Sequence, residues 1–227
     1  MSDWIHVTMQ YSNAVLVALL PHFSEFARKL DLPVPYPITT NHVQRFVTGV
    51  PVIKGYPIDV KGHLVLTNGY EFWFSWGYVE DFRSPRDYFT AQDVEQVPEF
   101  FGTLRLDRSV AVDLARKALK NVGYAEHLPM LRKKPSEVRG PKRFKGHIIP
   151  HYRITWKAKD RGQGTVHVHI DGEHGIVTGL FTASTNLWRS PPKIPIQPEL
   201  ESEYRRRVME GRQIHRRDPP PERRPSS

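Results

Sequence analysis

The stretch TVHVHIDGEHGIVTGLFTAS, residues 165–184, decides the fold of this chain. In its first half, apolar residues alternate with His167 and His169, which is the period of a β-strand with one apolar and one polar face. Asp171-Gly172 then supplies a turn, and a second apolar run follows it. The stretch therefore predicts two antiparallel strands whose apolar face is covered and whose polar face is open to water.

The residues before this stretch predict a helix and one more strand. Apolar residues between 110 and 122 recur every three or four positions, as on one face of a helix. Asp107 or Ser109 can cap the start of this helix, and Gly123 is placed to end it. The strands of this half are then expected at residues 152–159, 165–170 and 175–184.

The first half of the chain has the same order of elements. An apolar stripe predicts a helix over residues 13–30, which Pro21 should kink or divide. Asn68-Gly69 lies between two β-rich runs and is the strongest hairpin signal in the chain. The expected strands are residues 43–50, 63–67, 70–76 and 78–82.

A spacing of roughly one hundred residues between the two predicted helices suggests a duplication. An aromatic cluster between the halves favours a packed connector. Eight of the twenty prolines follow Ser190, so the end of the chain should be mobile or should order on a partner. The expected divisions are 1–92, a connector at 93–106, a second unit at 107–188, and a Pro/Arg-rich tail at 189–227.

Composition excludes several classes of protein. The chain has 39% hydrophobic and 11% aromatic residues, which suffices for a core, and no cysteine. Disulfides, thiolate metal sites and a cysteine nucleophile are therefore excluded. The apolar run 14–20 is too short to span a bilayer, and residues 1–13 lack the basic opening of a signal peptide.

The net charge of +9 raises the question of whether the chain binds nucleic acid. Much of the charge lies in the stretch 131–146, with seven basic residues and one acidic, and in the tail. Both read as loop or tail, where such charge is typical of solvated chain. The candidate binding residues of this basic loop are Lys133, Lys134, Arg139, Lys142 and Arg143.

Two other groups of residues could bind a metal ion or a ligand. His167 and His169 should project from one side of a strand, where Asp171 or His174 would complete a zinc site. The alternative is that these histidines only form the polar face of a sheet. Tyr70, Trp73 and Trp76 belong to an aromatic hairpin that either stacks on ligands or packs in the core.

The second half resembles the PepSY family. The resemblance rests on the helix VAVDLARKALKNVGY, the strand YRITWKAK and the hairpin VHVHIDGEHGIVTGL. It covers about 75 residues and implies a cystatin-like shape, a frequent extracytoplasmic location, and binding to peptidases or other partners. The phrases LPVPYPIT and NGYEFWFSWGYVEDFRSPRDYFTAQD also resemble those of uncharacterised bacterial proteins.

We therefore predict an α+β fold of two tandem cystatin-like units, each a helix packed on an antiparallel sheet, with a Pro/Arg-rich arm. We expect a non-enzymatic PepSY-like protein that binds a protein or peptide partner and uses no cofactor. Two alternatives stay open. One is a metal-dependent hydrolase using His167 and His169, and the other is nucleic-acid binding through the basic loop and tail.

Overall fold

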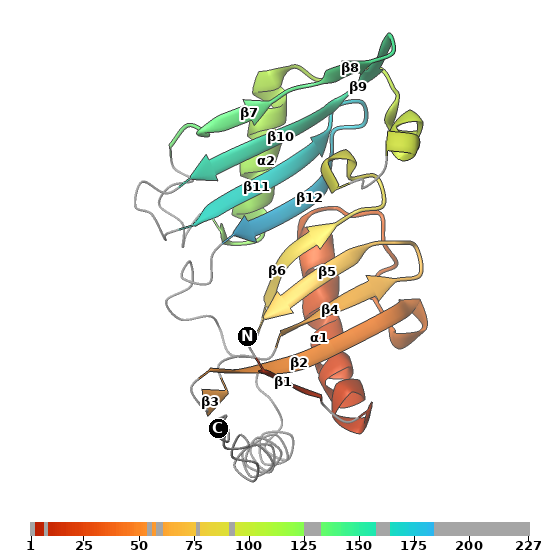
Figure 1. The fold of residues 1–227 in the computed structure, drawn as a ribbon, viewed down its shortest axis with the longest axis vertical. Helices are drawn as coiled ribbons and strands as arrows, with labels where there is room; N and C mark the ends of the chain where they lie inside the picture. Colours follow the sequence, from red (N-terminus) through yellow and green to blue (C-terminus); the bar gives the residue numbers. More distant parts are fainter. Residues whose placement is uncertain are drawn as a thin grey trace, which may run out of the picture.

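The structure is a computed structural model. It describes residues 3–6, 9–53, 56–57, 61–75, 78–90, 94–124, 133–157 and 164–183. Within these residues, helices and antiparallel strands form one mixed α+β body (Figure 1). The prediction of an α+β fold is confirmed. The predicted tail at 189–227 and Trp76 lie outside the described residues.

The first half consists of one long helix and a run of antiparallel strands. Helix α1 (Met9–Lys29) is followed by the short turn η1 (Thr40–His42) and by β2 (Val43–Ile53), β4 (Lys61–Leu66), β5 (Glu71–Ser75) and β6 (Tyr78–Arg83). Two further strands, β1 (Asp3–His6) and β3 (Tyr56–Pro57), pair with β2. Of the two outcomes expected at Pro21, a kink or a division of the helix, the division is not observed, because α1 runs on through Pro21.

Two sequence signals in the first half have the expected geometry. Gly69 takes a positive φ of 82° in the turn between β4 and β5, as the Asn68-Gly69 pair predicted. Four strands begin and end within a few residues of the predicted bounds. Strand β1 was missed because four residues with one charge show no clear alternation.

The second half begins with helix α2 (Arg108–Asn121). The Asp107 side chain accepts hydrogen bonds from the backbone N–H groups of Ser109 and Val110, so the predicted cap is confirmed. Gly123 follows the helix with a φ of 85°, as expected for a C-terminal stop. Strands β10 (His151–Lys157), β11 (Thr165–Asp171) and β12 (Ile176–Ala183) complete the half.

The basic stretch 131–146 is not the loop that its charge predicted. Its described part contains β7 (Glu137–Arg139), which pairs with β10, and β8 (Lys142–Phe144), which pairs with β9 (His147–Ile149). Val138 packs against the core and Phe144 is half-buried, so two apolar side chains outweigh the charge of their neighbours.

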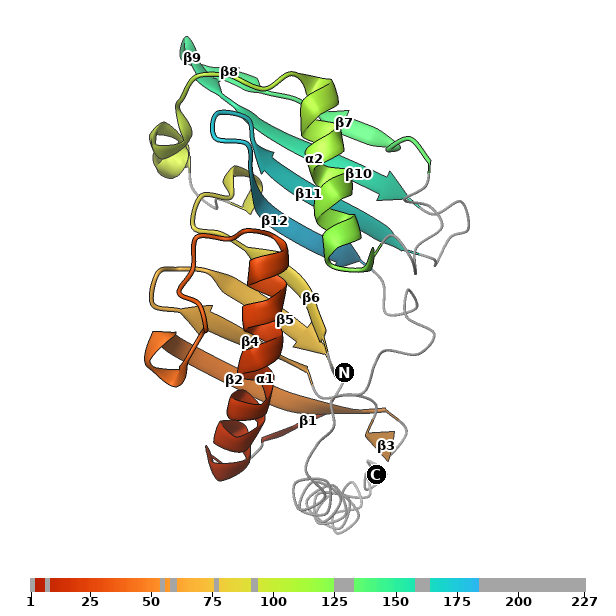
Figure 2. The same ribbon diagram turned by 180° about the vertical axis from the view of Figure 1, so that it is seen from behind.

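The strands of both halves join in one sheet, in the order β1-β2-β4-β5-β6-β12-β11-β10-β7. The join is the antiparallel pair β6 and β12, where Phe82 faces Leu180 and Arg83 faces Gly179. Both helices lie on the same face of this sheet, α1 over the first half and α2 over the second (Figure 2). We call the opposite face the open face.

The core lies between the helices and the sheet. Phe23 and Phe26 of α1 contact the rings of Phe72 and Phe82, which point to the helix side of β5 and β6. In the second half, Trp156 and other strand residues are buried with the small side chains of α2. The strand residues in this core include Ile154, Val166, Val168, Ile170 and Leu180.

Among the helices formed by the described residues, none is long and apolar enough to cross a membrane.

Candidate functional site

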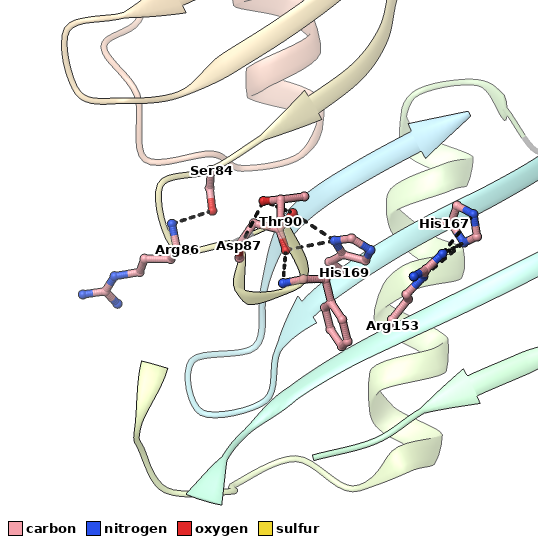
Figure 3. A network of polar contacts seen from close by, with 8 residues as sticks. Ser84, Arg86, Asp87, Thr90, Arg153, His167 and His169 are labelled. Carbon is pink, nitrogen blue, oxygen red and sulfur yellow. Dashed lines mark hydrogen bonds and ion pairs between the residues drawn. The ribbon is translucent and has the colours of Figure 1, made fainter. Parts of the chain in front are cut away.

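The segment after β6 lies on the open face of the second half, beside β11 and β12 (Figure 3). The Ser84 N–H donates to the Thr178 carbonyl, which continues the pairing of β6 with β12. The chain then turns through η2 (Tyr88–Thr90). Asp87 fixes this turn, because its carboxylate accepts from the Phe89 N–H and the Thr90 hydroxyl.

Asp87 also forms a buried pair with His169 of β11. The Nδ1 atom of His169 lies 2.9 Å from both carboxylate oxygens of Asp87. The side chains are 5% and 0% exposed, respectively. The rings of Phe89 and Phe181 lie 4.8 and 5.1 Å from the imidazole and enclose it. The pair therefore fastens the segment after β6 to the second half of the sheet.

Three buried polar atoms near this pair have no hydrogen-bond partner among the described residues. They are Nδ1 of His151, Nε2 of His169 and Oγ1 of Thr178. His151 lies between the rings of Tyr88 and Phe100, at 5.8 and 5.7 Å. Burial lowers the pKa of His151, and the charges of Asp171 and Asp87 oppose that effect. The imidazole of His151 is therefore kept neutral.

His167 lies on the same face of β11 but has other partners. The Thr155 hydroxyl lies 2.9 Å from its Nδ1, and a terminal guanidinium nitrogen of Arg153 lies 3.3 Å from each ring nitrogen. Burial and then the charge of Arg153 lower the pKa of His167 to about 4. His167 is thus a neutral, half-buried imidazole beside a guanidinium.

The residues proposed for a metal site do not converge. His169 is held by Asp87, whereas Asp171 is held by the His174 ring at 2.8 Å and by the Glu173 N–H. His174 is half exposed, at the turn after β11. Over the described residues, no group of three histidine, aspartate or glutamate side chains is placed to hold a metal ion. Each acid has a structural hydrogen-bonding role instead.

A row of polar and aromatic side chains crosses the open face of the first half. His63 stacks on Trp73 with ring centroids 4.6 Å apart, and Arg83 lies 5.9 Å from the Trp73 ring. Glu71 joins His63 and Arg83, through a hydrogen bond with His63 and an ion pair with Arg83. Phe181 of β12 lies 6.4 Å from Trp73, so the row continues onto the second half.

The aromatic residues chosen from sequence divide between the two faces. Trp73 is half-buried on the open face, where a partner can reach it. Tyr70 is only 6% exposed and belongs to the core, so its assignment to a binding surface is corrected. Tyr70 directly precedes β5, and its ring is part of the buried core cluster.

The five basic residues chosen from sequence are all exposed, but they lie in different elements. Lys133 and Lys134 precede β7, and Arg139 of β7 pairs with Glu137. Lys142 and Arg143 belong to the β8–β9 hairpin, and Lys142 lies 5.8 Å from the Tyr88 ring. Binding of nucleic acid through these residues stays a prediction.

No family model matches the chain, and no curated protein matches it. A solved structure, the Bacillus megaterium YpeB C-terminal domain, is similar with a TM-score of 0.40 and 14% sequence identity. The similarity covers 84% of this chain and 69% of that one.

Sequence reasoning missed the two charged residues that organise the site, Asp87 and Arg153. The sequence around Asp87 gives a weak local signal for its role in the turn, because SPRDYFT places an aspartate just before a short turn. Its partner His169 lies 82 positions away, which no local pattern indicates. Arg153 occupies a polar position of the strand β10. Its contact with His167 could not be predicted from a local pattern, because His167 lies on the adjacent strand β11.

We expect the free energy of unfolding to fall as the pH drops from about 6.5 to about 4. The pKa values of His151 and His167 are lowered in the folded protein, so the unfolded chain binds more protons over this range. Stability must then rise with pH between the folded and unfolded pKa values. Urea unfolding at a series of pH values measures this. The decline in the free energy of unfolding should be smaller in His167→Asn. A free energy of unfolding that does not change with pH over this range would contradict the lowered pKa values of the two histidines.

Proposed function

We propose that this protein is a non-enzymatic, PepSY-like binding protein that holds a segment of a partner protein on the open face of its sheet. The observation that carries the proposal is the placement of both helices on one face of a continuous sheet. The other face carries accessible arginine, histidine and tryptophan side chains on strands of both halves. This is the proposed binding surface.

The residue types on this face suit a protein partner. Arginine and tryptophan are enriched at the centres of protein interfaces, where they combine apolar contact with hydrogen bonding. Trp73 is already held by its stack on His63 and by Arg83, so little side-chain freedom is lost on binding. Val47, opposite His63 on β2, is 45% exposed and extends the apolar part of the surface.

We also propose that the two halves are related units of the PepSY type. Each half has a helix followed by antiparallel strands, and each helix packs on strands of its own half. The units correspond to 1–92 and 107–188, and the segment between them packs on the second unit through the ring of Phe100, 5.7 Å from that of His151. The last strand of each unit pairs with the last strand of the other.

The absence of cysteine allows a direct test with single introduced cysteines. Val47→Cys places a thiol on the open face, and Val17→Cys places one on the outer side of α1. Both valines are exposed, at 45% and 58%. Each variant is labelled with an environment-sensitive fluorophore and titrated with peptides selected on the unlabelled protein from a random peptide library.

We expect the selected peptides to change the fluorescence at position 47 and to leave that at position 17 unchanged. Trp73→Ala should weaken the binding of these peptides by about tenfold, since truncation of a central aromatic residue commonly removes 1–2 kcal/mol or more. The proposal would be overturned if the peptides changed the fluorescence only at position 17, or if the selection gave no peptide that binds saturably.

A further inference from the structure

Arg153 and His167 form a compact pair on the open face of the second half. Arg153 lies on β10 and His167 on β11, and Figure 3 shows both side chains on the side of the sheet away from α2. Guanidinium nitrogens lie 3.3–3.4 Å from the ring nitrogens of His167. Both residues are half-buried, so solvent or a partner can reach them from one side.

Arg153 forms no ion pair within the described part of the chain, although its charge, like those of Arg139 and Lys157, acts on the Glu137 carboxylate. None of the ion pairs between described residues includes Arg153, and the nearby Glu137 pairs with Arg139 instead. An arginine has five N–H donors, and among the described residues the side-chain hydrogen bonds of this one go to His167 alone. A half-buried guanidinium with free donors favours an anion whose oxygens match its planar fork, and a carboxylate is the group of this kind that protein side chains supply.

We propose that Arg153 and His167 bind a carboxylate of the partner, so that the segment held on the open face is acidic. This inference rests on the proposed function and adds the chemical class of the partner. The charge of the surroundings agrees with it, because Lys157 of β10 adds positive charge beside this pair in a chain of net charge +9, whereas Arg83 and Arg139 on β6 and β7 are each paired with a glutamate.

A bound carboxylate should also couple binding to a proton. The charged or titratable groups facing His167 are Arg153 and Lys157 of β10, His169 of β11 and Glu137 of β7. Its neighbour on β12 is the apolar Phe181. Added negative charge would raise the pKa of His167 from the value of about 4 that it has in the protein without a bound carboxylate. Binding would then take up a proton, and affinity would increase as the pH falls toward the pKa of the bound state.

The test uses fluorescein-labelled hexaglutamate and the full chain, at about pH 7.5 and about pH 5.5, where glutamate stays ionised. We expect binding to be several-fold tighter at the lower pH. Arg153→Gln should weaken binding about tenfold at both values, because a charge-assisted hydrogen bond is lost. His167→Asn should remove most of the pH dependence. Arg108→Gln, at the exposed start of α2, is the matched control and should bind as the wild type does.

A second measurement in the unaltered protein does not depend on how the variants fold. The His167 ring is titrated by NMR with and without saturating hexaglutamate, and its pKa should be higher with the peptide. An unchanged pKa would overturn the proposal. An equal loss of affinity in Arg108→Gln and Arg153→Gln would also overturn it, since the attraction would then follow net charge only.

Failure of this inference can be told from failure of the proposed function. If selected peptides report at position 47 but hexaglutamate does not bind, or binds independently of Arg153, the carboxylate site is wrong and the binding surface stands. If no selected peptide reports at position 47, the proposed function itself fails.

Discussion

Replacement of Asp87 by alanine is expected to lower the free energy of unfolding by about 3–5 kcal/mol. The change removes the partner of His169, whose side chain is only 5% exposed and whose other ring nitrogen has no partner among the described residues. It also removes the acceptor for the Phe89 N–H and the Thr90 hydroxyl. One substitution thus leaves a buried imidazole and a turn without their hydrogen bonds.

Urea unfolding at neutral pH measures this effect, and Glu25→Ala is a suitable control. Glu25 pairs with Arg28 on the surface of α1, with both side chains more than 40% exposed, so its loss should change stability far less than the loss of Asp87. Combining Asp87→Ala with His169→Leu should recover part of the loss, because the unpaired imidazole is then gone. Equal effects of the Asp87 and Glu25 changes would show that the buried pair is not formed.

Replacement of Gly179 by alanine is expected to destabilise the protein by about 1–3 kcal/mol. A Cβ at this position would lie 2.7 Å from an Asp87 carboxylate oxygen, 2.7 Å from the Phe181 ring and 3.0 Å from Nδ1 of His169. The carboxylate cannot move away without giving up its bonds to His169. Gly179 also faces Arg83 at the join between the two halves, so the strain falls on that join.

Gly140→Ala provides the matched control for this prediction. A Cβ at Gly140 would meet only the Tyr152 ring, at an ordinary 3.8 Å, and we expect a change below about 1 kcal/mol. Thermal or urea unfolding of the two variants measures this difference in stability. If Gly179→Ala is as stable as Gly140→Ala, the close approach of Asp87, His169 and β12 is not present in solution.

Much of the fold could be predicted because its signals are local. Asp107 caps α2 through N–H groups two and three residues further on, and Gly69 and Gly123 adopt the positive φ that their turns require. The alternation in β11 placed Val168 against α2 and His167 on the opposite face, as expected for a sheet covered on one side. Each of these outcomes depends on neighbours within a few positions.

The errors came from elements whose structure depends on distant packing. The basic stretch before β9 was read as a loop from its charge, whereas pairing with β10 makes part of it a strand. Pro21 was expected to kink or divide the helix, and the division does not occur, because α1 continues through Pro21 with Leu19, Leu20 and Phe23 buried on either side. In both places the gain from burial outweighs the local preference.

The sequence by itself determined the α+β class, the two helices, most of the strands and which face of each strand is apolar, because backbone periodicity, caps and turns act over a few residues. Only the tertiary structure decided what the polar face does. The pairing of β6 with β12 brings Asp87 onto His169, and the pairing of β10 with β11 brings Arg153 onto His167. Such contacts follow from strand order and register, which join residues far apart in the chain and leave no local pattern.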